Sequence, residues 1–121
     1  MRYLLLIYSE EPTAPPSQEE IDATMAEWWE FDGAIKASGV HLAGDALQNS
    51  QTATTVRVKD GERVVTDGPF AETREVLGGF YLIDVPDLDT ALDWAAKCPG
   101  AKYGTMEVRP VLAFDDFEPP K

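Results

Sequence analysis

Two short runs of almost continuous apolar residues constrain the fold of this chain more than any other feature. The first covers residues 3–8 and the second covers residues 79–85. A strand that is apolar on both faces is usually buried on both faces, which indicates a position inside a sheet rather than at its edge. The sequence therefore predicts a sheet built around these two central strands.

A long helix is predicted after the first strand. Residues 17–20 have the pattern of a capping box, in which the Ser17 hydroxyl accepts a hydrogen bond from the Glu20 amide. The helix should run to about Ser38, with Gly39 as its stop. At helical spacing it carries an apolar side, flanked by Trp29 and Asp32, that consists of Ile21, Met25, Trp28, Phe31 and Ile35.

A second helix is predicted after the other apolar strand. Asp87 is suited to cap its first turn, and Pro99 with Gly100 should end it. The residues that we expect to face inward are Leu88, Ala91, Leu92 and Ala95.

Four further strands complete the predicted order, at residues 41–47, 53–58, 62–66 and 105–112. Residues 59–61 read Lys-Asp-Gly and predict a tight hairpin turn, because Asp-Gly accommodates the positive φ that such a turn needs. The order is that of a split βαβ unit, so we expect an α+β, ferredoxin-like fold with an inserted β-hairpin. The length of 121 residues fits a single domain over residues 1–121, with a polar C-terminal tail from about residue 113.

Charge and cysteine content limit the possible partners. The formal net charge of −12 repels phosphates and anionic lipids, so we expect neither nucleic acid nor a membrane surface as a partner. The chain has one cysteine, Cys98, which fits a reducing compartment, and it has no apolar stretch of membrane-spanning length. These features predict a cytoplasmic protein.

The segment between the hairpin and the second apolar strand holds a dense group of charges around a Gly-Pro break. We call residues 66–75 the signature loop, and it reads Thr66-Asp67-Gly68-Pro69-Phe70-Ala71-Glu72-Thr73-Arg74-Glu75. Asp67-Gly68-Pro69-Phe70, with the charged residues after it, resembles the DGPF motif of YCII-related proteins. The resemblance extends to residues 78–83, 93–99 and 107–111 and so covers most of the chain.

The resemblance implies ferredoxin-like protomers that pair their sheets into a dimeric α/β barrel. The predicted fold favours the same assembly, since helices cover one face of its sheet and leave the other open. We therefore expect a homodimer formed through the open face.

The signature loop supplies most of the candidate site residues. Asp67 is a candidate catalytic base, although an Asp before Gly-Pro can equally cap a turn through backbone amides. Glu72, Arg74 and Glu75 are candidate substrate-binding residues, with Arg74 holding an anion. The alternative for these three is a network of salt bridges.

Other candidates lie outside the loop. His41 is the single histidine and a second candidate catalytic residue, because histidine changes its charge near neutral pH. Arg109 shares a strand face with Glu107. It is a candidate substrate-binding residue, and the alternative is an ion pair with Glu107. Tyr8 and Tyr81 lie on the central strands, where their hydroxyls can reach a cavity. No metal site and no cofactor motif is recognisable.

The leading functional hypothesis is a small-molecule-binding protein, and an enzyme is one form of it. Its chemistry would be cofactor-independent proton transfer or elimination on a small organic acid or phenol. The alternative is a non-catalytic dimeric interaction module, because DGPF-type domains resemble accessory partners of transcription-initiation sigma factors. In a third interpretation the signature loop is purely structural and locks the hairpin to the sheet.

Overall fold

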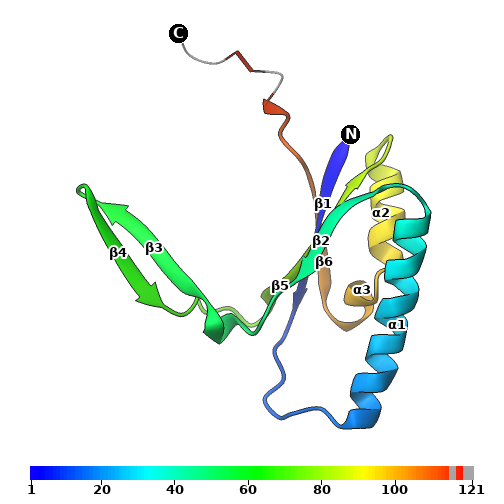
Figure 1. Ribbon diagram of the computed structural model, residues 1–121, viewed down its shortest axis with the longest axis horizontal. Helices are drawn as coiled ribbons and strands as arrows, with labels where there is room; N and C mark the ends of the chain where they lie inside the picture. The colour runs from blue at the N-terminus through cyan, green and yellow to red at the C-terminus, as the bar shows by residue number, and fades with distance from the viewer. Residues whose placement is uncertain (115–116, 119–121) are drawn as a thin grey trace.

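The computed structural model describes residues 1–114 and 117–118. Its main element is a four-stranded sheet in which every neighbouring pair is antiparallel (Figure 1). The strands follow the order β2 (His41–Ala46), β5 (Val76–Asp84), β1 (Arg2–Ser9) and β6 (Thr105–Pro110). The two apolar strands, β1 and β5, are therefore the central pair, as their sequences predict.

Helices cover one face of this sheet. Figure 1 shows α1 (Gln18–Ala37) and α2 (Leu88–Lys97) side by side on that face, with the short α3 (Pro99–Tyr103) at the end of α2. The core lies between the two layers and includes Leu5, Ile83 and Ile35, each fully buried. A mixed α+β chain with this antiparallel strand order is consistent with the predicted ferredoxin-like fold.

Helix α1 has the predicted caps. The Glu20 amide donates to the Ser17 hydroxyl at 3.1 Å, and Gly39 follows the helix with a φ of +85°. The predicted apolar side is buried at Phe31 and Ile35 but exposed at its N-terminal end. The helix therefore contacts the sheet closely along its second half and leaves space along its first half.

Helix α2 differs from its prediction in the side chains that face inward. Asp87 caps it by accepting from the Thr90 amide at 2.8 Å, but Leu88 and Leu92 are exposed, whereas Ala91 and Ala95 are buried. Expecting both leucines to face inward was wrong, because the two alanines allow the helix to approach the sheet closely. Helix α2 ends at Lys97, just before Pro99 and Gly100 as predicted, but the sequence did not predict the short helix that follows. Proline is well accommodated at the first position of a helix, and it begins α3 here.

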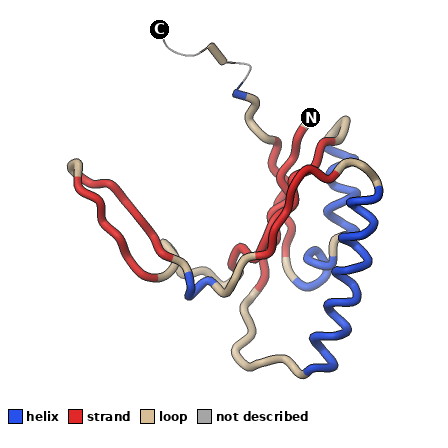
Figure 2. Tube along the Cα trace, in the orientation of Figure 1, coloured by secondary structure: helices blue, strands red, loops and turns tan. Residues whose placement is uncertain are grey.

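The inserted hairpin forms a separate two-stranded sheet. It consists of β3 (Thr54–Lys59) and β4 (Glu62–Asp67), and we call residues 54–67 the arm. Asp60 and Gly61 have φ values of 53° and 79°, so the predicted tight turn is confirmed. A single 3₁₀ turn, η1 (Ser50–Thr52), precedes the arm. Figure 2 shows the arm extending away from the main sheet on the side opposite the helices.

The C-terminal segment follows β6. The predicted tail begins near Ala113, and residues 115–116 and 119–121 of it lie outside the described part. Helices that combine the length and the hydropathy needed to cross a bilayer are absent from the described residues.

Candidate functional site

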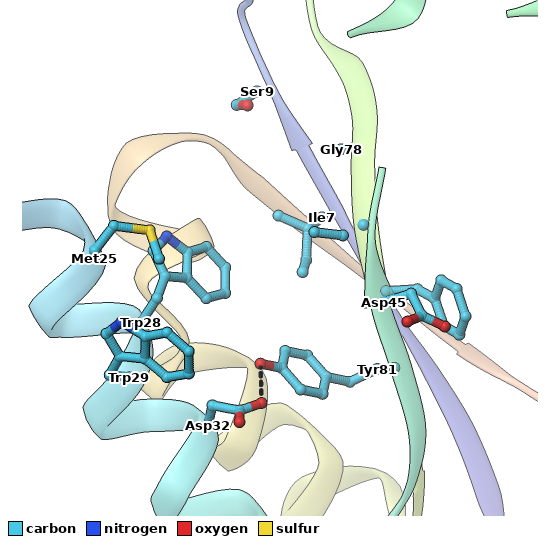
Figure 3. Close-up of a pocket in the computed structure, with 13 residues that line it drawn as sticks. Ile7, Ser9, Met25, Trp28, Trp29, Asp32, Asp45, Gly78 and Tyr81 are labelled. Atoms are coloured by element: carbon cyan, nitrogen blue, oxygen red, sulfur yellow. Dashed lines mark hydrogen bonds between the residues drawn. The ribbon is translucent and has the colours of Figure 1, made fainter. Parts of the chain in front are cut away.

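A cavity of about 530 Å³ lies between α1 and the main sheet. Figure 3 shows Met25, Trp28 and Trp29 on the α1 side, with Ile7 and Tyr81 facing them from the sheet. The cavity lies along the middle of α1, from Met25 to Asp32. Concave sites of this size with mostly apolar walls and few polar groups are typical of small-molecule binding.

Two glycines keep the sheet side of the cavity open. Gly44 pairs with Tyr81 across β2 and β5, and Gly79 lies two residues before Tyr81 on the same face. A Cβ atom at Gly44 would lie 2.9 Å from Tyr81 Cδ1, and one at Gly79 would lie 2.9 Å from the Asp45 carbonyl oxygen. Larger residues at either position would therefore displace the Tyr81 ring or separate the strands.

The polar end of the cavity is a short chain of hydrogen bonds. The Tyr81 hydroxyl donates to Asp32 Oδ1 at 3.0 Å (Figure 3). Lys36 Nζ lies 2.8 Å from Asp32 Oδ2. The hydrogen bond from Lys36 lowers the pKa of Asp32, with a smaller contribution from Tyr81. Burial raises the pKa of Tyr81, and the bond to Asp32 raises it further. The pair is therefore a carboxylate and a neutral phenol at neutral pH.

His41 lies next to this pair. Its ring centroid is 5.8 Å from that of Tyr81, in an edge-to-face arrangement. His41 also lowers the pKa of Asp32, though less than Lys36 and Tyr81 do. The structure thus brings His41 together with Tyr81 and Asp32, while Asp67 lies in the separate sheet of the arm.

The predicted residues of the signature loop lie at the surface. Asp67 is exposed at the end of β4 opposite Thr54, and Glu72 is exposed in the loop. The Arg74 side chain is 88% exposed and pairs through Nε with Glu10. Glu75 is half-buried and accepts from the Thr105 hydroxyl at 3.3 Å. The ion pair of Arg74 favours the salt-bridge alternative for this loop over substrate binding. The hydrogen bond of Glu75 joins the loop to β6.

A second hollow, of about 580 Å³, borders the signature loop. Pro69, Phe70 and Thr73 line it together with Tyr8 and the residues around η1. The described lining of the two cavities includes none of the four charged loop residues Asp67, Glu72, Arg74 and Glu75. Both tyrosines that the sequence places near a cavity do line one, Tyr81 the first and Tyr8 the second.

Arg109 lies on the sheet face opposite the helices. Its Nε is 2.9 Å from Glu107 Oε1, so the predicted pairing within β6 is observed. The Glu107 oxygen is shielded from solvent, and no partner among the described residues reaches it with hydrogen-bond geometry. The contact is thus an ion pair rather than an aligned hydrogen bond, and the carboxylate keeps a free acceptor position.

Sequence reasoning missed Asp32 as a site residue and placed it merely beside the apolar side of α1. The available signal was the spacing Trp28, Asp32, Lys36, which puts an aromatic, a carboxylate and an amine on one face of a helix. Its partner Tyr81 is 49 residues away in the sequence, so the pair becomes visible only in the fold.

Two other kinds of chemistry find little support. Cys98 is buried and burial raises the pKa of its thiol to about 11, which disfavours the reactive thiolate. Within the described residues, no three His, Cys, Asp or Glu side chains cluster closely enough to hold a metal ion.

The described residues thus form an α+β domain with a largely apolar cavity between helix and sheet. The YCII-related domain matches residues 1–115, so the chain belongs to the YCII-related family. An uncharacterized protein of Rhizobium meliloti (strain 1021) is 38% identical to it over 99% of both chains.

Proposed function

We propose that this protein binds a small molecule in the cavity between α1 and the sheet. One observation carries the proposal: the cavity is largely apolar, with two tryptophans in its wall, and its few polar side chains include the hydrogen-bonded pair Tyr81 and Asp32 beside Ser9 and Asp45. Such a site gives affinity through apolar contact and orientation through one hydrogen-bonding end. We also assign the chain to the DGPF subgroup of its family from Asp67-Gly68-Pro69-Phe70.

The polar end favours a ligand that donates a hydrogen bond. The Tyr81 proton is committed to Asp32, so the Tyr81 oxygen and Asp32 both offer acceptor positions to a ligand. Among the described residues that line the cavity, none is a lysine or arginine. Of the ligand classes expected from the sequence, a phenol therefore fits better than an organic acid, whose carboxylate would find no counter-charge in the lining.

The same groups favour binding over catalysis. An efficient general acid or base has a pKa close to the working pH. The pKa of Asp32 is lowered and that of Tyr81 is raised, so both shifts lead away from neutrality. In an enzyme, the proton-transfer role would fall to His41, which contacts Tyr81, while Asp67 would have to reach the site from another part of the assembly.

We further propose that the protein is a cytoplasmic homodimer. The sheet face opposite the helices carries four large apolar side chains, Leu4, Leu6, Phe80 and Leu82, that are each partly exposed. A second copy would cover this face, as in a dimeric α/β barrel.

Calorimetric titration tests the ligand proposal. We expect 4-ethylphenol to bind and 4-ethylbenzoate, which has the same ring and tail, to bind at least about tenfold more weakly. Tyr81→Phe keeps the ring but removes the hydroxyl and the contact with Asp32, so it should weaken binding of the phenol by a factor of about 5–10.

Tryptophan fluorescence locates the binding. Trp28 and Trp29 line the cavity, whereas Trp94 packs against Phe31 outside it. The phenol should change the emission of the wild-type protein but not that of a Trp28→Phe, Trp29→Phe variant. Heat of binding without a fluorescence change would place the ligand elsewhere, and no binding by any phenol or acid would contradict the proposal.

A further inference from the structure

The arm exposes an apolar face. In its register Val56 lies opposite Val65 and Val58 lies opposite Arg63, so the three valines share one face of the two-stranded ribbon. Val56, Val58 and Val65 are 59%, 75% and 54% exposed. Exposed β-branched residues grouped on one ribbon face are unusual in a protein that stays free of partners.

The arm is also held away from its own body. The Gly68 amide donates to the Ala53 carbonyl at 2.7 Å, and the Thr55 hydroxyl donates to the Gly68 carbonyl at 2.8 Å. These bonds fix the base of the ribbon, and Figures 1 and 2 show it diverging from the main sheet on the side of the open face. An isolated two-stranded hairpin is marginally stable in water, so this one requires a covering surface.

Charge indicates what that surface is. The arm carries Arg57, Lys59 and Arg63 against Asp60, Glu62 and Asp67, so its formal charge is zero. The whole net charge of −12 therefore belongs to the rest of the chain. A ribbon with exposed basic side chains and an apolar face complements the acidic body of a second copy, whose partly exposed sheet face is apolar as well.

We propose that in the homodimer each arm packs its valine face on the body of the partner copy. Because the dimer has a two-fold axis, each copy places its arm on the other. We call this arrangement the exchange, and it covers the valine face of both arms. Asp67 shares the face of Val65, and the exchange therefore carries this residue of the signature loop to the partner. The inference rests on the proposed homodimer but not on the proposed ligand.

Two neighbouring valines provide a matched test. Val65 and Val64 are 54% and 47% exposed, and they lie on opposite faces of the same strand. Light scattering after size-exclusion chromatography over a dilution series measures the dimer dissociation constant of the wild type, Val65→Glu and Val64→Glu. We expect Val65→Glu to raise the constant at least about tenfold, because it buries a charge, and Val64→Glu to change it by less than about threefold.

The outcomes separate the arm from the dimer. A wild-type monomer at all concentrations would overturn both proposals. A wild-type dimer that both variants retain would overturn the arm contact and leave a dimer formed through the sheets alone. Equal weakening by both variants would overturn the assigned face. Because the arm lies outside the core, the three proteins should show the same circular dichroism spectrum before heating, which would exclude misfolding of the variants as the cause.

Discussion

At the scale of single residues, the hydrogen bond between Tyr81 and Asp32 determines what the cavity can do. It joins a strand to a helix across the cavity and fixes the protonation of both partners, since the ionised carboxylate holds the phenolic proton. The bond is therefore both a structural tie and the polar end of the site. Its two roles can be measured separately, because stability reports the tie and ligand affinity reports the site.

The stability of the fold should depend on Tyr81 at alkaline pH. The raised pKa of Tyr81 means that the folded state holds the phenolic proton more tightly than the unfolded chain, where tyrosine titrates near pH 10. This contribution is complete below about pH 10 and is lost as the pH rises above it. Above about pH 10 the melting temperature of the wild type should thus fall more steeply with pH than that of Tyr81→Phe. Tyr103→Phe, which removes an exposed tyrosine, is the control and should follow the wild type.

The candidate residues show what can be predicted at this scale. A tyrosine on a central strand is expected to face one layer or the other, and Tyr81 and Tyr8 do border cavities. The clustering of charges in the signature loop was visible in the sequence, but the direction of each side chain was not. Arg74 instead pairs with Glu10, a residue 64 positions away. Such pairings depend on how loops meet in space.

At the scale of elements, most boundaries follow from local rules. Caps, a Gly stop and an Asp-Gly turn depend on neighbouring residues, and the caps of α1 and α2 and the turn of the arm were predicted correctly. The inward face of α2 was not, because alanine and leucine are both apolar and only packing against the sheet selects between them. The short helix α3 was not predicted either, because a proline such as Pro99 can follow the end of one helix and also begin the next.

The junction of α3 and β6 should tolerate no side chain at Gly104. A Cβ atom there would lie 2.0 Å from the Tyr8 carbonyl oxygen, a backbone atom of the central strand β1. We expect Gly104→Ala to lower the free energy of unfolding by about 1–3 kcal/mol, measured by urea denaturation. Gly33→Ala is the matched control, because nothing lies within 4 Å of the added atom in the exposed middle of α1. It should raise the stability by about 0.5–1 kcal/mol, so equal effects of the two changes would contradict the assigned packing.

At the scale of the whole molecule, the sequence predicts the order of the sheet but not the direction of the arm. Two apolar strands and two crossover helices restrict the main sheet to few arrangements, and the observed order β2, β5, β1, β6 is the expected one. The inserted hairpin has no such constraint, because its turn fixes its register and nothing in its own pattern fixes where the ribbon points. That direction depends on a few bonds at its base and, in our proposal, on a second copy.

Hydrogen exchange should reveal whether the arm is covered in solution. Each strand of a two-stranded ribbon has an edge, so an uncovered arm opens easily and its amides exchange fast. If the arm packs on a partner, the amides that bond across the ribbon between β3 and β4 should be protected at high protein concentration and lose that protection on dilution. Amides that join β1 and β5 provide the internal control, because the core holds them in each copy. An arm that exchanges rapidly at every concentration, beside a protected core, would show that its valines remain in water, and the charge balance of the arm would then need another explanation.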